Sequence, residues 1–377
     1  MQLNMQPNAD IENNDVAQWI ALNQTLGLGN AALCQLLTKF GSPDAIYSAS
    51  IKQLCEIVDD KIARKIKHGI DADAIAPTLN WLQKDNAHVV TLANSTYPKK
   101  LLEISNPPAV LYAIGNLHWL NHPSIAMVGS RSATPQGEKN AEEFAASLCH
   151  FGLCVVSGMA LGIDGAAHRG TLKANGATIA VVGTGLDIVY PARHRNLAHQ
   201  IAERGLIISE FPLGTPSKAQ NFPRRNRLIS GLSLGCLVVE ANIESGSLIT
   251  ARLATEQGRE VFAIPGSIHS PVAKGCHQLI KQGAKLVENT QDILEEIKNL
   301  LPATHSPTGL MDETNTAIAT GLEGNTVLAL MGYDAINFDT LLQLSTLTTE
   351  ALSAMLMMLE LEGKITVLTG NQYQRLI

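Results

Sequence analysis

The sequence predicts an α/β protein built on a Rossmann-like, doubly wound and mainly parallel sheet. Between residues 123 and 287, short apolar segments rich in β-branched residues alternate with segments of helical periodicity. A glycine stands just before six of the seven expected strands, where a preceding helix needs a left-handed C-terminal residue. Nearly continuous apolar strands are typical of a parallel sheet with helices on both faces.

The expected strands follow one another along the middle of the chain. They are Ile125–Val128, Cys154–Ser157, Thr178–Val182, Leu206–Ser209, Cys236–Glu240, Glu260–Ile264 and Lys285–Val287. Residues 86–120 form a lead-in that we expect to add an edge strand, because 88–92 is extended in character.

A chain of 377 residues is long enough for two or three domains. We expect a small helical domain over 1–85 and the Rossmann-like domain over 86–298. A linker with Pro, Thr and Gly over 299–323 then leads to a winged-helix-like domain over 324–377.

The first domain resembles helix-hairpin-helix or SAM-like modules, because the turn at 26–29 (Leu-Gly-Leu-Gly) precedes an amphipathic helix. Such a hairpin can present backbone amides to a phosphate. Lys39 is the one basic residue near this turn in the sequence. A plain helical domain is therefore favoured over a phosphate-binding one.

The last domain has the pattern of three helices and a terminal hairpin. Its would-be recognition helix, 349–361, contains no Lys or Arg. Readers of the major groove need donors for base edges and cations for phosphates. This domain is therefore expected to contact protein or to pack, and not to read DNA.

The net charge of −6 is unevenly distributed. Residues 91–298 hold 19 Lys and Arg against 16 Asp and Glu, whereas 1–90 hold 7 against 10 and 299–377 hold 2 against 8. A polyanion is therefore expected to bind the middle of the chain.

The six cysteines form no C-x-x-C pair and are expected to be buried thiols of a reducing compartment. With neither a signal-like start nor a membrane-spanning segment, we expect a cytoplasmic protein without membrane insertion.

Small and polar residues follow the expected strands at their carboxyl ends, the edge where open α/β sheets bind ligands. Their backbone amides can approach an anion closely, so a phosphate-bearing ligand is expected. The candidates are Gly129, Ser130, Arg131, Ser157, Gly158, Gly183, Ser245, Gly246 and Ser247. Ser245–Ser247 also starts a helix, which favours an anion.

The segment 222–227 carries the clearest sign of a nucleic acid. It places the aromatic Phe222 beside Arg224, Arg225, Asn226 and Arg227, and a short apolar turn is expected to connect it to the next strand. Cations beside a flat ring suit a ligand with phosphates and bases. The alternative is a core Phe222 with arginines on a solvated loop.

Several catalytic and cofactor motifs are absent from the sequence. There is no P-loop, no dinucleotide fingerprint after Gly129, and neither HExxH nor Cys/His metal-ligand spacing. We therefore expect no metal, no cofactor and no catalytic residue.

Several stretches together resemble the DNA-processing protein A family (DprA, also called Smf) of natural transformation. They are MVGSRSATPQG, VVSGMALGIDGAAHRGTL, TIAVVGTGLDIVYPARH, ISEFPLGT, FPRRNRLISGLS, VVEANIESGSLITARLATEQGREVFAIPG and KGCHQLIKQGAKLV, all between 127 and 287. The resemblance implies a non-enzymatic protein that binds and protects incoming single-stranded DNA and helps to load the RecA recombinase. It also implies a homodimer formed through the Rossmann-like domain.

The resemblance also suggests individual site residues. The arginine of the family's GSR motif is Arg131, and the aromatic of its FPxRNR motif is Phe222, with Arg225 and Arg227 as the motif's cations. Arg224 occupies the variable position. The further candidates for backbone contacts are Arg193, Arg195 and Lys218. The dimer is expected to use apolar positions near the last strand, namely Ile268, Leu279 and Ile280.

Two alternatives remain open. The first is a nucleotide-processing enzyme of the phosphoribohydrolase-like Rossmann class, in which Asp164 and His168 would form an acid/base pair. The stretch 244–252 lacks the catalytic Glu of that class, and a helix-stabilising Asp164 with a packed His168 is favoured. The second alternative is a protein-interaction scaffold with a vestigial basic crevice.

Overall fold

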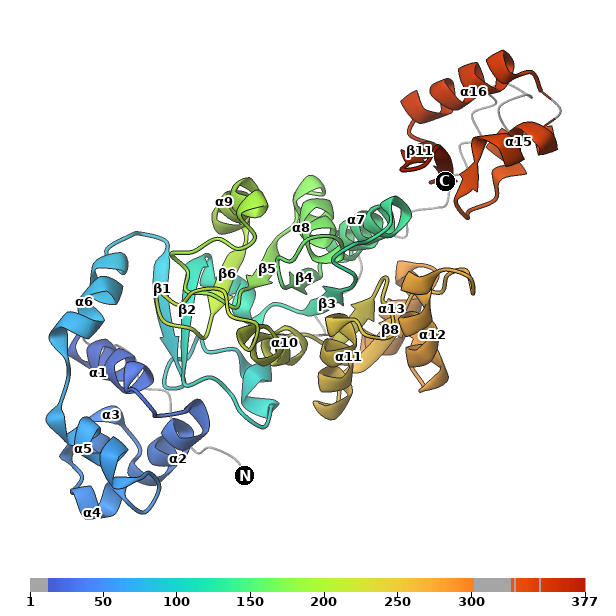
Figure 1. Cartoon of the computed structure of the whole chain (residues 1–377). Coiled ribbons are helices and arrows are strands. Elements are labelled where there is room, and N and C mark those ends of the chain that lie inside the picture. Colours follow the sequence, from blue (N-terminus) through green and yellow to red (C-terminus); the bar gives the residue numbers. More distant parts are fainter. Residues whose placement is uncertain (1–12, 302–326, 329, 346, 377) are drawn as a thin grey trace.

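The computed structural model describes residues 13–301, 327–328, 330–345 and 347–376. Within them, a nine-stranded mixed sheet has the strand order β1-β2-β6-β5-β4-β3-β7-β8-β9 (Figure 1). The strands are β1 (Ala87–Thr91), β2 (Val110–Gly115), β3 (Ser124–Val128), β4 (Cys154–Ser157), β5 (Thr178–Val181), β6 (Leu206–Ser209), β7 (Gly235–Val238), β8 (Glu260–Ala263) and β9 (Lys285–Leu286).

The sheet from β3 to β9 is parallel throughout, which confirms the predicted doubly wound fold. Each of the seven expected strands is present, with ends that differ by at most two residues. The lead-in contributes two strands where we expected one. β1 pairs antiparallel with β2, and β2 pairs antiparallel with β6.

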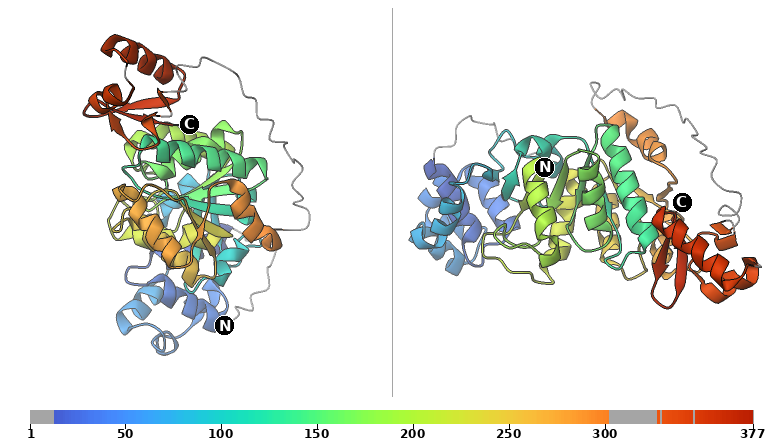
Figure 2. Two further views of the ribbon diagram at one scale, coloured as in Figure 1. Left: turned by 90° about the vertical axis from the view of Figure 1, so that its right-hand side faces the viewer. Right: turned by 90° about the horizontal axis from the view of Figure 1, so that it is seen from above.

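Helices cover both faces of the sheet (Figures 1 and 2). One face carries α7 (Pro135–His150), α8 (Ile163–Lys173), α9 (Arg195–Arg204) and α13 (Thr290–Ile297). The other face carries α10 (Asn221–Leu232), α11 (Gly246–Glu256) and α12 (Lys274–Lys281). The strands between them are almost fully buried, as their continuous apolar sequences require.

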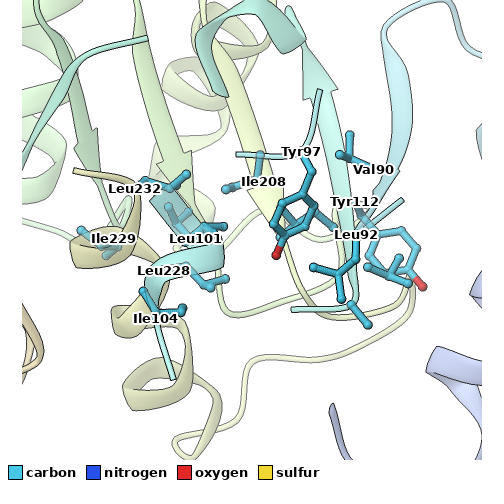
Figure 3. Packing of buried hydrophobic residues seen from close by; sticks show 14 of the residues in the cluster. Val90, Leu92, Tyr97, Leu101, Ile104, Tyr112, Ile208, Leu228, Ile229 and Leu232 are labelled. Carbon is cyan, nitrogen blue, oxygen red and sulfur yellow. The ribbon is translucent and has the colours of Figure 1, made fainter. Parts of the chain in front are cut away.

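Residues 221–232 form the helix α10, so the expected apolar turn after the arginines is wrong. Leu228, Ile229 and Leu232 recur at helical spacing and are buried. They pack near Leu101 of the 3₁₀ turn Lys99–Glu103 and Ile104, which follows that turn (Figure 3). Pro223 lies in the first turn, where a missing N–H costs no hydrogen bond. The helix therefore presents the arginines on different faces, since successive residues are about 100° apart.

The N-terminal segment is helical as predicted and packs on the edge of the sheet. Its helices are α1 (Asn13–Gln24), α2 (Asn30–Phe40), α3 (Pro43–Ser48), α4 (Ile51–Leu54), α5 (Asp60–His68) and α6 (Ala72–Trp81). Trp81 meets the ring of Tyr112 on β2 edge-on at 6.5 Å, and the Tyr112 hydroxyl accepts a hydrogen bond from Asn23 (3.2 Å). The hydrophobic core thus continues from these helices into the sheet.

The C-terminal segment forms a winged-helix domain. It contains β10 (Ile336–Asn337), α15 (Phe338–Ser345), α16 (Thr349–Leu361), β11 (Ile365–Leu368) and β12 (Gln372–Arg375), with the sheet order β10-β12-β11. The expected helix 325–331 is helical at its described positions, whereas 325, 326 and 329 lie outside the described residues. Most of the predicted linker, 302–323, also lies outside them, and the domain boundaries stay a prediction.

The cysteines and the helix lengths bear on the two remaining expectations, buried thiols and no membrane insertion. Cys154, Cys236 and Cys276 are buried, but Cys55 is exposed, so the prediction of buried thiols is wrong for Cys55. Across the described part of the chain, no helix combines the length and the apolar character needed to cross a membrane.

Candidate nucleic-acid interface

A groove of about 800 Å³ lies at the carboxyl ends of β3 and β7. The chain proceeds from β3 to β4, β5 and β6 on one side and later to β7, β8 and β9 on the other, so the sheet changes direction at β3. Ligands of open α/β sheets bind at this kind of switch point, because the loops on either side of it diverge. The groove therefore lies where the fold itself favours a ligand.

The structure brings nine of the predicted site residues together around this groove. They are Gly129, Ser130, Arg131, Phe222, Arg225, Asn226, Ser245, Gly246 and Ser247. The lining does not include the remaining predictions, which are Ser157, Gly158, Gly183, Arg193, Arg195, Lys218, Arg224 and Arg227.

The mouth of the groove combines an exposed cation with two aromatic rings. Arg131 is exposed, and its guanidinium carbon lies 5.4 Å from the ring centre of Phe222. The ring of Tyr190 also lies beside Phe222, with ring centres 5.7 Å apart, and Tyr190 is 47% exposed. Phe222 is half-buried, so its ring is anchored while part of it stays accessible. This arrangement suits a base that stacks and a phosphate that meets the cation.

The loop that carries Arg131 is fixed from β7. The Ser130 amide donates to the Glu240 carbonyl oxygen (2.8 Å), and the Glu240 carboxylate accepts from the Thr134 amide (2.9 Å). Gly129 has no room for a side chain, because a Cβ there would lie 2.5 Å from the Ile163 side chain. The Ser130 amide is therefore not available to an anion, which corrects its predicted role. It holds the loop in place.

Arg225 is a buried cation beneath the groove. It is 4% exposed, and its Nη1 donates to the Val181 carbonyl oxygen of β5. Burial lowers the pKa of Arg225 to about 10, and the nearby Asp164 opposes this shift, so the guanidinium is charged at neutral pH. Gly158 is required beside it, because a Cβ would lie 1.9 Å from Nη1. Arg225 therefore supports the groove from below, where we had predicted a surface cation.

Asp164 is the counter-charge of Arg225. It is 7% exposed and lines the groove, and its Oδ2 accepts from the Ala160 amide at 3.2 Å. Burial raises the pKa of Asp164, while Arg225 and the Ala160 N–H lower it. The carboxylate thus stabilises both the loop before α8 and the buried guanidinium.

Arg227 and Arg224 lie on another face of α10, around Glu210. Arg227 forms a buried ion pair with Glu210, with side chains 13% and 4% exposed. Arg224 is 55% exposed, lies 3.8 Å from the same carboxylate and stacks on Phe211 at 5.2 Å. Burial raises the pKa of Glu210, and the two arginines lower it. Arg227 therefore has a structural partner, and Arg224 is the accessible cation of the three.

The remaining candidates divide into buried and exposed residues. Ser157 is fully buried, and its hydroxyl donates to the Met127 carbonyl oxygen (2.6 Å), so the predicted contact with a ligand is wrong for it. Gly183 is also buried; its carbonyl accepts from Asn221 (3.0 Å), and its Cα faces the Phe222 ring. Arg193, Arg195 and Lys218 are exposed and lie outside the groove lining.

Ser245 caps the start of α11. Its hydroxyl accepts from the Ser247 amide (3.3 Å), and the two serine hydroxyls are 2.7 Å apart. This bond uses one of the helix-start amides that we expected to face an anion. Gly246 is exposed at the groove, and the acidic Glu244 also lines it. The cationic side of the groove is therefore the side of Arg131.

Asp164 and His168 do not converge on a common site. His168 is fully buried, and its Nδ1 lies 2.7 Å from the Thr178 hydroxyl. That hydroxyl donates to the Val155 carbonyl oxygen (2.7 Å), so Nδ1 must carry the proton in the bond with His168. The buried Nε2 has no partner among the described residues. The packed His168 and loop-stabilising Asp164 agree with the favoured structural interpretation.

The buried His168 predicts a loss of stability in acid. Burial lowers its pKa to about 3, whereas an unfolded chain protonates histidine near pH 6.5. Between these values the unfolded state binds one more proton, so the free energy of unfolding decreases by about 1.4 kcal/mol for each unit by which the pH is lowered. Urea denaturation at about pH 6, 5 and 4 should show this dependence. The pH dependence should be smaller in His168→Gln. Equal pH dependence in the two proteins would contradict its assignment to the buried His168.

The predicted dimer positions differ in exposure. Ile268 is 74% exposed, but Leu279 is only 9% exposed and belongs to the core, and Ile280 packs against that core. Leu279 is therefore not available to the predicted dimer contact, because α12 turns it toward the sheet. A second groove of about 520 Å³ lies between α11 and α12, and the exposed Ile243 and Ile249 line it.

Tyr190 is not among the predicted site residues. It lies within the matching stretch TIAVVGTGLDIVYPARH, and no spacing connects it to Phe222, which lies 32 positions later. The ring contact arises because the loop after β5 and the start of α10 meet at the same edge of the sheet. Its 47% exposure is the structural sign of a free ring face.

Family models match two parts of the chain. Residues 88–298 match the DNA recombination-mediator protein A family, and residues 312–371 match the DprA winged helix domain. The Smf protein of Synechocystis is 34% identical over 96% of this chain and 99% of its own length. The Smf protein of Escherichia coli is 48% identical over 226 residues, and the matched region spans 60% of each protein.

Solved structures agree with these matches. DNA processing protein A of Streptococcus pneumoniae has a TM-score of 0.67 and 36% identity, over 76% of this chain and 99% of that protein. DNA processing protein A of Helicobacter pylori, whose structure concerns its single-stranded DNA binding mode, has a TM-score of 0.52 and 30% identity. It covers 57% of this chain and 98% of that protein. The chain therefore belongs to the DNA recombination-mediator protein A family, whose members include the DprA and Smf proteins.

Proposed function

We propose that the chain binds single-stranded DNA in the groove at the carboxyl ends of β3 and β7. The observation that carries this proposal is the cluster of Arg131, Phe222 and Tyr190 at the mouth of the groove. The single-stranded DNA binding mode of the H. pylori relative supports it. In a duplex the base faces are covered by their neighbours, so unpaired strands should bind more tightly.

In this mechanism each residue has a separate role. Arg131 neutralises a backbone phosphate, and Phe222 and Tyr190 stack on bases. Every base has a flat face, so stacking carries little sequence preference. The buried Arg225 and Asp164 keep the floor of the groove in one conformation, which lowers the ordering cost on binding. Arg224, Arg193 and Lys218 extend the cationic surface along the strand.

The wider role follows from family membership. We propose that the protein protects incoming single strands during natural transformation and helps to load the RecA recombinase, as a recombination mediator would. It would act in the cytoplasm as a homodimer, with Ile268 and the groove between α11 and α12 as the contact surface. Two groove sites on one strand would then raise the avidity. The separation of Asp164 from a buried His168 favours binding over catalysis.

Arg131→Ala tests the phosphate contact. The variant should bind a single-stranded oligonucleotide more weakly, and the slope of log K against log salt should fall by about 0.7, the value for one phosphate contact on a single strand. Fluorescence titration at several salt concentrations measures both quantities. Arg204→Ala is the matched control, since Arg204 is exposed where α9 ends, before the amino end of β6. Equal slopes for the two variants would count against the groove.

A further inference from the structure

The N-terminal helices carry a second concentration of positive charge, on α5. Lys61, Arg64, Lys65 and His68 are spaced three and four residues apart, so they form one stripe along the helix. Lys61, Arg64 and His68 are exposed, and Lys65 is half-buried. Four of the seven Lys and Arg of residues 1–90 lie between 61 and 67. An overall acidic segment therefore contains a local cationic surface.

This stripe lies against the turn that follows α1. The Lys65 ammonium donates to the Leu26 carbonyl oxygen (2.8 Å), and the Gly27 Cα packs near Ile62. A groove of about 460 Å³ is lined on one side by Arg64, Lys65 and His68 and on the other by Thr25 and Leu26, with Asp71 also in its lining. In the sequence only Lys39 is near this turn, because α5 is more than thirty positions away along the chain. That reason for discounting a phosphate site is therefore wrong.

The turn offers hydrogen-bond donors as well. Within the described part of the chain, the backbone amides of Leu26 and Gly27 donate to no acceptor. The Leu26 side chain is 78% exposed beside them. Free amides, cations and an exposed apolar side chain suit a ligand that alternates phosphates with sugars and bases.

The acidic side chains nearby are mostly engaged in capping. Asp59 accepts from the Ile62 amide at the start of α5 (2.7 Å), and Asp71 accepts from the Ala74 amide at the start of α6 (3.2 Å). Asp60 pairs with Arg64 at 2.6 Å on an exposed surface, where such pairs contribute little and exchange readily. Lys61 has no ion-pair partner among the described residues. The stripe between the helix ends is thus free to meet an anion.

We infer that the turn at 26–27 and the stripe on α5 form a second binding site for the phosphodiester backbone of a nucleic acid. This site lies on the N-terminal helices. In Figure 1, α5 is well separated from α10 and α11, which carry part of the groove lining. It goes beyond the proposed function, because it would hold a longer strand or a neighbouring duplex while the groove grips a few unpaired nucleotides.

The test is Lys61→Gln/Arg64→Gln in the full chain, with Lys52→Gln/Lys84→Gln as the matched control. Both variants lose two exposed cations from the N-terminal segment, but Lys52 and Lys84 lie outside the stripe on α5. Of the two test positions, Arg64 lines the groove and Lys61 extends the stripe beyond it. Lys65 is left in place because it holds the turn. The probes are a single strand of about six nucleotides, one of about 40 nucleotides and a duplex of about 40 base pairs.

We expect the test variant to bind the short strand like the parent and the longer probes more weakly. Its salt slope should fall by about 1.4 on the long single strand, or by about 1.8 on the duplex. Loss on only one long probe would identify which form uses the site. The inference is overturned if the test and control variants bind both long probes equally. The short strand tests the groove alone. If the groove does not bind DNA, Arg131→Ala will bind the short strand like the parent, and this result is distinguishable from a failure of the site on α5.

Discussion

Phe222→Ala is expected to weaken the binding of a single-stranded oligonucleotide by about 1–3 kcal/mol, because base–aromatic stacking contributes this much per base. At 25 °C this is a loss of about five- to 150-fold in affinity. The salt slope should stay nearly constant, since no phosphate contact is removed. Titration of a fluorescent oligonucleotide at several salt concentrations measures both effects.

Two substitutions at the same position separate stacking from packing. Phe222 packs against Gly183 and Tyr190, so its removal could also disturb the local structure. Phe222→Tyr keeps a flat ring and should retain most of the affinity, whereas Phe222→Leu keeps an apolar side chain without one and should behave like the alanine variant. Full affinity in Phe222→Leu would show that the ring does not stack on a base.

Arg225→Met is expected to produce the largest loss of stability, about 3–5 kcal/mol, because it leaves the carboxylate of Asp164 buried without its counter-charge. Without Arg225 the pKa of Asp164 should rise further, so the carboxyl binds a proton more readily in the folded state than in the unfolded state. Stability then falls as the pH rises, and the loss should be greater at about pH 7 than at about pH 5.

Arg224→Met is the matched control for this prediction. Arg224 is the preceding residue on the same helix, is 55% exposed, and leaves Glu210 paired with Arg227 when it is removed. Its loss should cost less than about 1 kcal/mol. Hydrogen exchange of the amides in β3, β4 and β5 reports the stability of the sheet itself. Equal protection in the two variants would contradict a structural role for Arg225.

The strands could be predicted closely because their signals are local. Each strand is a short apolar run such as Ile179–Val181. The expected left-handed glycine after a helix is present at Gly152, Gly258 and Gly283, whereas Gly235 is the first residue of β7. Burial on both faces makes these runs nearly continuous, so neighbouring sequence is enough to locate them. The groove lies beside β3, where the order of the strands in the sheet changes direction. This place depends on which strands pair with one another.

The candidate site could be predicted only in part, because side-chain direction depends on tertiary packing. The sequence of 222–227 does not show which way each arginine points, but in α10 one arginine is buried beneath the groove and another pairs with Glu210. The contact of Tyr190 with Phe222 and that of Lys65 with the turn at Leu26 join residues far apart in sequence. Neither a motif nor a spacing records such contacts.

Photocrosslinking tests the groove most directly. A single strand of about six nucleotides carrying a halogenated uracil can be irradiated on the full chain and the modified peptides sequenced. Crosslinks should fall on Phe222 and Tyr190, and they should be lost when unlabelled single strand is added in excess. Crosslinks confined to the winged-helix domain, with none on the peptides around these two rings, would contradict single-stranded DNA binding in the groove.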